Sequence, residues 1–241
     1  MAFDPERRAF GARPFGMVDT AAVDEALRAY MLRVYNIMAS GLLLSGIVAV
    51  ALALSPTAMS VIFGSGLGIV AMLLPLGILM AMSFGINRMQ ARTIEILYWV
   101  FVASFGLSLS TVFVVYQLGS VAEVFFITAG TFGAMSLYGY TTGRDLTRFG
   151  SFLFMGLIGI IIAMVVNLFV QSSAFGFLIS VLGVLIFTGL TAYDTQRIKS
   201  QFYASEPGEM MTKRAVMSAV QLYLDFINLF MFLLNIMGQR R

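Results

Sequence analysis

The residues best able to do chemistry in this chain are carboxylates and amides inside apolar sequence. Asp225 occurs in LYLDFINLF, within an apolar run over residues 215–238. A carboxylate at the centre of a membrane helix costs ~2.5 to 3.5 kcal/mol, which is more than one interhelical hydrogen bond returns. We therefore expect Asp225 to serve a function such as proton or cation binding.

Further polar side chains share the helical face of Asp225. They follow one another at intervals of three, four, three and seven residues, which is helical spacing. Because lipid cannot satisfy amides and carboxylates, this face must contact other helices or a water-filled cavity, and the last helix should be central. Two interpretations stay open, namely hydrogen bonding between packed helices and the lining of a pore. The face consists of Ser218, Gln221, Asp225, Asn228 and Asn235.

A second acidic residue, Asp194, occurs in FTGLTAYDTQRIK at the end of an earlier apolar run. Arg197 follows one helical turn later, and an exposed Asp–Arg pair at this spacing is common and contributes little to stability. Spacing alone is therefore compatible with a surface ion pair or with a function. Arg88 and Arg92, in FGINRMQARTIEI, could reach such carboxylates, although arginines beside apolar runs are also ordinary membrane anchors.

The composition predicts that these residues lie on membrane-spanning helices. Hydrophobic residues make up 59% of the 241 residues, charged residues only 11%, and the mean hydropathy is +0.91. Seven apolar runs are long enough for the ~30 Å hydrocarbon core. Short connections between them leave no separate soluble domain. The predicted spans are residues 34–54, 67–86, 97–116, 124–140, 152–170, 175–193 and 215–237.

The basic residues predict the orientation of these spans. When sides alternate, thirteen of the fifteen Lys and Arg residues fall on one side, and only Arg240 and Arg241 on the other. The positive-inside rule then places the N-terminus in the cytoplasm and the C-terminus outside. We expect residues 1–28 to form a cytoplasmic segment, flexible at first and then an amphipathic helix, and residues 29–241 to form the transmembrane domain. The predicted fold class is an all-α integral membrane protein, a seven-helix bundle with the last helix central.

Missing residue types exclude several classes of function. The chain has no Cys and no His, so disulfides, thiolate nucleophiles, the usual zinc sites and imidazole bases are ruled out. It also has no GxSxG or HExxH motif, and we expect no enzymatic activity. The basic residues are scattered between apolar runs without interleaved aromatic residues, so we expect no nucleic-acid partner.

Two motifs together resemble those of a known family. LTAYDTQRIK near the end of the sixth span and LYLDFINLF in the seventh, with seven spans and a basic N-terminal approach, are similar to the bacterial branch of the transmembrane Bax-inhibitor-motif family. The similarity covers about residues 25–238. It implies a bundle whose last helix is wrapped by the other six, in agreement with the polar face. It also implies a multi-pass protein of the bacterial inner (plasma) membrane.

The resemblance further implies a calcium leak channel controlled by pH through a pair of aspartates. These fall on Asp194 and Asp225, and the arginine that can bond to one of them falls on Arg88, with Arg92 one turn later as the alternative. Two buried carboxyl groups and a guanidinium can share a proton near physiological pH. We predict that Asp194 and Asp225 form the pH sensor and metal site, and that an Arg88–Asp194 bond latches the path.

Calcium is expected as a transient ligand, with no permanently bound cofactor. It prefers roughly six to eight oxygen ligands, and two carboxylates supply at most about four. Thr191, Asn228, carbonyls or water would complete the shell, and weak binding suits conduction. The expected partners are the lipid bilayer, Ca²⁺ and protons. The residues expected to line the path are Ser218, Gln221, Asn228 and Thr191.

The chain departs from the family pattern in its 197–214 connection, which is longer than in compact members, and in its second span, which has no acidic residue. The long connection bears on how the aspartates meet. Asp194 lies three residues before Arg197, whereas Asp225 lies eleven beyond Arg214. The seventh helix would have to begin near residues 206–210, or a watery vestibule would have to reach inward.

Two rival functions remain open. Some family members are tied to cell-death regulators, and a bacterial relative to a membrane-bound protease, so the chain could be a membrane interaction protein that regulates such a partner. The N-terminal segment and the 198–213 loop would then matter more than the aspartates. The other rival is a proton-coupled transporter, in which Asp225 would carry the proton.

Overall fold

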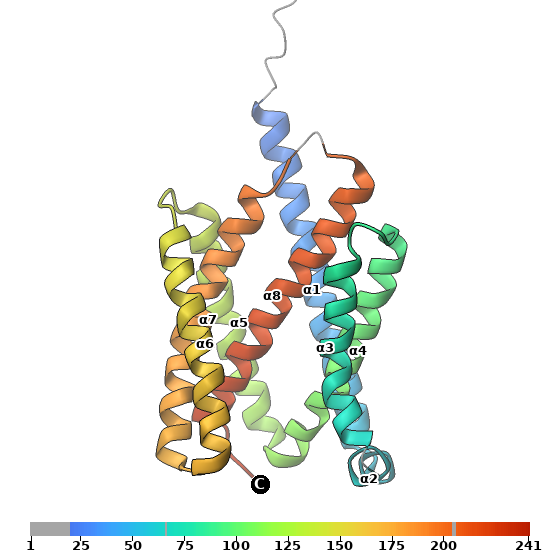
Figure 1. Cartoon of the computed structure of the whole chain (residues 1–241), viewed down its shortest axis with the longest axis vertical. Helices are drawn as coiled ribbons and strands as arrows, with labels where there is room; N and C mark the ends of the chain where they lie inside the picture. The colour runs from blue at the N-terminus through green and yellow to red at the C-terminus, as the bar shows by residue number, and fades with distance from the viewer. Residues whose placement is uncertain (1–19, 66, 204–205) are drawn as a thin grey trace, which may run out of the picture.

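The computed structural model describes residues 20–65, 67–203 and 206–241, which fold into helices joined by short connections (Figure 1). In this part of the chain, seven helices are long and apolar enough to cross a membrane. The protein is an all-α membrane protein, as its hydropathy predicts. The predicted flexible start, residues 1–19, lies outside the described residues. The helices are α1 (Thr20–Ala53), α2 (Pro56–Gly64), α3 (Leu67–Gly85), α4 (Ala91–Val115), α5 (Leu118–Thr141), α6 (Thr147–Val170), α7 (Ser173–Ser200) and α8 (Gly208–Met237).

Six of the seven long helices that the structure describes extend at least five residues beyond the predicted spans, and three of them bear on the site. α1 is continuous from Thr20, so the expected amphipathic approach and the first span form one helix. α7 continues to Ser200 and α8 begins at Gly208, whereas the spans were predicted to end at residue 193 and to begin at residue 215. Hydropathy detects only the part of a helix inside the hydrocarbon core, because a helix can continue into the polar interface.

The short helix α2 was not predicted. The Ser55 side chain accepts a hydrogen bond from the Ala58 backbone N–H at 3.3 Å, and Pro56 is the first helical residue, which is a favourable start. None of its residues is buried, and it lies at the end of the bundle opposite the start of α1 (Figure 1). At nine residues, α2 is too short to span a membrane, so it is a surface connection between α1 and α3.

The two ends of the bundle differ in charge. The start of α1 and the α3–α4, α5–α6 and α7–α8 connections lie at the upper end in Figure 1, whereas the C-terminus lies at the lower end. The basic residues that the structure describes belong to the segments at the upper end, apart from Arg240 and Arg241. We call the upper end the basic end. Its position in the cytoplasm stays a prediction from the positive-inside rule.

The last helix is central, as its polar face predicts. α8 crosses the bundle obliquely, with α5, α6 and α7 on one side and α1, α3 and α4 on the other (Figure 1). In its most apolar stretch 67% of the residues are buried, against at most 39% in any other span that the structure describes. It packs against α1, α4, α5 and α7. Polar groups on α8 are thereby sheltered from lipid.

Polar contacts fix α8 along its length. At the basic end, Arg214 Nε lies 2.9 Å from Glu206 Oε1. In the middle, the hydroxyls of Tyr223 and Ser45 are 2.7 Å apart, and Ser45 donates to the Val102 carbonyl at 2.6 Å, which joins α8 to α1 and α4. The C-terminal residues pair with the α4–α5 corner. Rotation of α8 would break these contacts, so the direction of its polar face is set.

Close packing at Gly139 positions the part of α7 that carries Asp194. A Cβ at Gly139 of α5 would collide with the backbone of Ala192, two residues before Asp194. Only glycine allows this approach, because interiors are close-packed and backbone cannot give way as a flexible side chain can. The α5–α7 contact therefore fixes where Asp194 can lie.

Gly139→Val is expected to lower the melting temperature of the detergent-solubilised protein. Overpacking typically costs ~1–3 kcal/mol, which for a chain of this length corresponds to a decrease of roughly 5 °C. Gly130→Val is the matched control, because Gly130 lies on the same helix and a Cβ added there would meet nothing within 4 Å. A thermal-shift measurement in which both variants melt together would contradict this packing role.

Candidate functional site

The two predicted aspartates meet in the middle of the bundle. Asp194 on α7 and Asp225 on α8 are 3% and 5% exposed, and their carboxyl groups lie within hydrogen-bonding reach of each other. A hydrogen bond between two carboxyl groups requires a proton on one of them, because a carboxylate only accepts. The pair is therefore arranged to share a proton.

The paths of α7 and α8 explain how the pair meets. Because α7 continues to Ser200, Asp194 is an interior helical residue and not part of an exposed ion pair at a helix end. Because α8 begins at Gly208, Asp225 lies ~26 Å along it by the usual helical rise. The oblique course of α8 brings this position against α7 (Figure 1). Two ways for the aspartates to meet were compatible with the sequence, and a last helix that begins near residues 206–210 is the first of them.

Two carboxyl oxygens of the pair have no hydrogen-bond partner among the described residues. They are Asp194 Oδ1 and Asp225 Oδ2, and both are fully buried. A buried polar atom without a partner costs free energy, and a charged one costs more. Gln221 lines the same cavity as Asp194, and Arg197 follows Asp194 by one helical turn on α7. The free oxygens give the site acceptor capacity for a proton, a water molecule or a cation.

The predicted latch arginines lie apart from the pair in this structure. Arg88 is an exposed residue of the α3–α4 connection, and Arg92 is exposed in the first turn of α4. In the part of the chain that the structure describes, neither forms an ion pair with Asp194 or Asp225. The latch therefore stays a prediction about another conformation.

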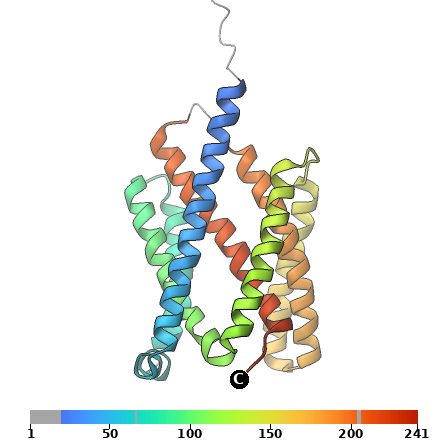
Figure 2. The ribbon, with the colours of Figure 1, turned by 180° about the vertical axis from the view of Figure 1, so that it is seen from behind.

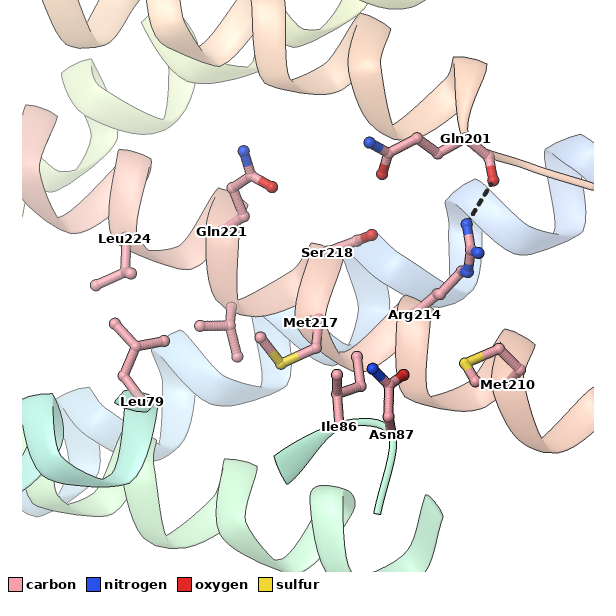
Figure 3. A pocket seen from close by; sticks show the side chains of 11 residues that line it. Leu79, Ile86, Asn87, Gln201, Met210, Arg214, Met217, Ser218, Gln221 and Leu224 are labelled. Carbon is pink, nitrogen blue, oxygen red and sulfur yellow. Dashed lines mark hydrogen bonds between the residues drawn. The ribbon is translucent and has the colours of Figure 1, made fainter. Parts of the chain in front are cut away.

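A vestibule lined by five polar and six apolar residues lies at the basic end of the bundle (Figure 3). This cavity of about 490 Å³ lies between the α3–α4 connection, the end of α7 and the first half of α8. Arg214 lines it and donates to the Gln201 carbonyl at 3.4 Å. A vestibule that reaches inward is the second of the two ways for the aspartates to meet that were compatible with the sequence. Its other polar lining groups are Asn87, Gln201, Ser218 and Gln221.

A second cavity, of about 360 Å³, contains the aspartates and is lined by α6, α7 and α8. Gln221 and Leu224 line both this aspartate cavity and the vestibule. In Figure 3, Gln221 and Leu224 follow Ser218 along α8, away from Arg214. These two side chains therefore lie between the vestibule at the basic end of the bundle and the carboxyl pair.

The four residues expected to line a path have different surroundings. Ser218 lines the vestibule, and its hydroxyl is 3.2 Å from that of Tyr30, so it also joins α8 to α1. Gln221 lines both cavities, and Asn228 lines the aspartate cavity. Thr191 lines neither cavity. Its hydroxyl donates to the carbonyl one turn earlier on its own helix, at 2.8 Å, so the structure does not support a pore-lining role.

A buried chain of hydroxyls beside Asp194 was missed in the sequence. The Tyr35 hydroxyl is 2.5 Å from that of Ser136, which is 2.9 Å from that of Thr195. The chain crosses from α1 through α5 to α7 and ends at the residue after Asp194. Isolated hydroxyl residues in apolar spans are a signal for such bonds, but one sequence does not show which ones meet.

Comparison with known proteins agrees with the motifs. The model of a family described as "Inhibitor of apoptosis-promoting Bax1" matches residues 27–241. The chain belongs to this family. The resemblance of its two aspartate motifs to the Bax inhibitor family is thereby confirmed, and the match takes in both aspartates, most of the first span and the other six spans that the structure describes.

Several bacterial proteins are similar to this Bax inhibitor family member. RP147 of Rickettsia prowazekii is 49% identical over 179 residues, which cover 74% of this chain and 76% of that protein. A protein of Borreliella burgdorferi is 47% identical over 195 residues, covering 80% and 84%. The inner membrane protein YbhL of Escherichia coli K12 is 42% identical over 197 residues, also covering 80% and 84%.

Proposed function

We propose that this Bax inhibitor family member is a pH-sensitive calcium leak channel of the bacterial inner membrane. The observation that carries the proposal is the placement of Asp194 and Asp225 in the centre of the bundle, next to a vestibule with which their cavity shares two residues. Buried carboxylates inside a membrane protein are costly and commonly mark ion or proton pathways. The likeness to YbhL, named an inner membrane protein, supports the location.

The site is suited to brief contact with calcium. Calcium prefers roughly six to eight oxygens, whereas the two carboxylates offer about four. Gln221 and Asn228, whose amides carry further oxygens, line the same cavity, and the described residues bring no third acidic side chain there. Water and carbonyls would supply the rest. Such a site binds weakly enough for the ion to leave, so calcium is proposed as a transient ligand.

Protons and calcium compete for the same oxygens. A shared proton keeps one carboxyl group neutral and occupies one acceptor position. As pH rises and the pair loses its proton, the negative charge available to a cation increases. The occupancy of the site by calcium should therefore increase with pH, while the latch adds a second dependence on the charge of Asp194.

Reconstitution tests the proposal directly. The purified protein is placed in liposomes that contain a calcium dye, and calcium flux is measured on both sides of neutral pH, with protein-free liposomes as the control. A calcium flux that depends on the protein and on pH is expected. Calcium flux equal to that of the protein-free liposomes at every pH would contradict a channel and favour an interaction protein.

Arg88→Gln is expected to increase calcium flux at pH values at which Asp194 is charged. The proposed latch joins Arg88 to Asp194 when the path closes, and an interfacial ion pair contributes ~1 kcal/mol at most, so the increase should be up to about fivefold. Arg92→Gln is the matched comparison in the same dye assay. An increase with Arg92→Gln alone would assign the latch to Arg92, and no increase with either would contradict the latch.

A proton-coupled transporter is the second candidate. The presence of two buried carboxyl groups in one cavity favours it, since ionisable residues inside a membrane protein commonly mark proton relays. Electrogenic uptake of a specific solute, driven by a proton gradient and abolished by Asp225→Asn, would favour the transporter over the channel.

A further inference from the structure

A long groove runs between α1 and α5 on the face of the bundle seen in Figure 2. In that view α1 and α5 lie in front, and α8 crosses behind the space between them. The groove comprises a cavity of about 410 Å³ near the basic end and one of about 920 Å³ farther down. Phe132 of α5 lines both, so the two cavities adjoin along the bundle surface. We call it the α1–α5 groove.

The lower part of the groove is apolar. Its sides come mainly from α1, α4 and α5, and its floor from Phe226, Ile227 and Phe230 of α8. Ser45 is a hydroxyl residue in this lining, but its hydroxyl is already bonded to α4 and α8. A hydrocarbon chain could therefore lie there without burying an unsatisfied polar group.

The upper end of the groove is polar and cationic. Arg28 of α1 and Tyr140 of α5 line it, and Arg28 forms no ion pair with any residue the structure describes. Lys199 Nζ donates to the Tyr140 carbonyl at 2.8 Å and lies 4.9 Å from the centre of its ring, which adds a second positive charge. Asp24 and Glu25 precede Arg28 on α1 but line neither cavity. An anionic group is thus favoured at this end.

The spacing of these parts matches one leaflet of a bilayer. The helix rise from Arg28 to Ala39, where the apolar cavity has begun, is ~16 Å. Half of the hydrocarbon core is ~15 Å thick. A lipid with its phosphate at Arg28 would therefore place most of one acyl chain in the upper cavity beside Phe132 and only its end in the apolar cavity.

We propose that the α1–α5 groove binds one anionic phospholipid of the bilayer. Its phosphate lies at Arg28, near the charge of Lys199, and one acyl chain lies along the upper part of the groove, with its end in the apolar cavity near Phe226, which packs against Phe132. Phe226 follows Asp225 in α8, so the chain supports α8 from the side opposite the aspartate cavity. The site is separate from the proposed calcium path and does not depend on it.

Two substitutions test the groove with little risk to the fold. Gly133 lines the upper cavity, and a Cβ added to it would meet nothing within 4 Å, so Gly133→Leu adds a side chain to the groove without a collision. Gly130→Leu is its control on the same helix, because Gly130 lines neither cavity and is equally unhindered. Arg28→Gln removes the headgroup charge. Arg33→Gln is its control, because Arg33 lines neither cavity and its Nη2 lies 3.6 Å from Glu95 Oε1 of α4.

The measurement is native mass spectrometry of the full chain, released from nanodiscs that contain phosphatidylglycerol and phosphatidylcholine in equal amounts. One retained phosphatidylglycerol per chain is expected. Arg28→Gln should weaken its retention about fivefold relative to phosphatidylcholine, as expected for one basic residue near a membrane surface. Gly133→Leu should weaken retention of both lipids about tenfold, which corresponds to the loss of roughly two buried methylene groups. The two controls should match the unmodified chain.

Four results would overturn the proposal. The first is that no lipid is retained, and the second is that Gly133→Leu and Gly130→Leu retain lipid equally. The third is that Arg28→Gln loses both lipids to the same extent. The fourth is that the chain forms a dimer whose formation Gly133→Leu abolishes. The last result would assign the groove to a second copy of the chain. Added glycerol 3-phosphate should not displace the lipid, and displacement would indicate a phosphate site that needs no acyl chain.

Discussion

Replacing Asp225 with asparagine is expected to lower calcium flux through the reconstituted protein at least about tenfold, a factor equal to ~1.4 kcal/mol. The change removes one negative charge from a buried site, where a unit pair at contact interacts by roughly 4 kcal/mol even with strong screening. Asparagine keeps the size and can still donate to Asp194, so the fold should persist. The pH dependence should also become shallower, because the pair loses one of its two titrating groups. Dye-loaded proteoliposomes on both sides of neutral pH measure both effects.

Asp145→Asn is the matched control, since Asp145 is an exposed carboxylate in the α5–α6 connection, remote from both cavities. It should leave calcium flux unchanged. Asp194→Asn should reproduce the loss, and the double variant should lose little more, because residues that act as one site are not additive. Unchanged flux and unchanged pH dependence in both single variants would show that the pair is not the site.

The two aspartates differ in how far the sequence could identify them. Asp225 is distinctive because it lies deep in an apolar run, where no surface explanation is available. Asp194 is ambiguous, because Arg197 one turn later also fits an exposed ion pair. Its burial depends on α8, which begins at Gly208 and crosses α7 obliquely, and on the close α5–α7 contact at Gly139. Those are tertiary facts that local spacing does not contain.

Apolar runs and the positions of basic residues were sufficient to predict the seven spans, and the helical spacing of polar residues was sufficient to predict the polar face of α8. They did not give the end of α7 or the start of α8, because the polar turns of these helices outside the hydrocarbon core do not resemble membrane sequence, whereas helical spacing did predict the amphipathic start of α1. The sequence contains a recognisable start for α2 at Ser55 and Pro56. With only nine residues, however, α2 is too short for a span, and its residues were predicted as a connection between spans. Cavities such as the vestibule depend on how helices tilt and cross, which one sequence does not specify.

Leu224→Ala is expected to raise calcium flux about tenfold. Leu224 and Gln221 are the residues common to the vestibule and the aspartate cavity, so they lie where the two cavities adjoin on the proposed path. Apolar constrictions hinder ions by excluding water. Removing the isopropyl group of leucine takes away apolar surface worth ~2 kcal/mol, more than the ~1.4 kcal/mol of a tenfold change. The same dye-loaded proteoliposomes measure it, and Leu185→Ala is the control on the exposed side of α7.

Gln221→Leu is the opposite change at the same constriction, and it should lower calcium flux. It removes the one amide among the two residues that line both cavities, so their junction becomes wholly apolar. The pair of opposite results excludes instability as the cause, because Leu224→Ala should weaken packing and yet conduct more, whereas an unstable channel would conduct less. If both changes lower flux equally, or neither alters it, calcium does not pass between Gln221 and Leu224, and the vestibule is not its route to the aspartates.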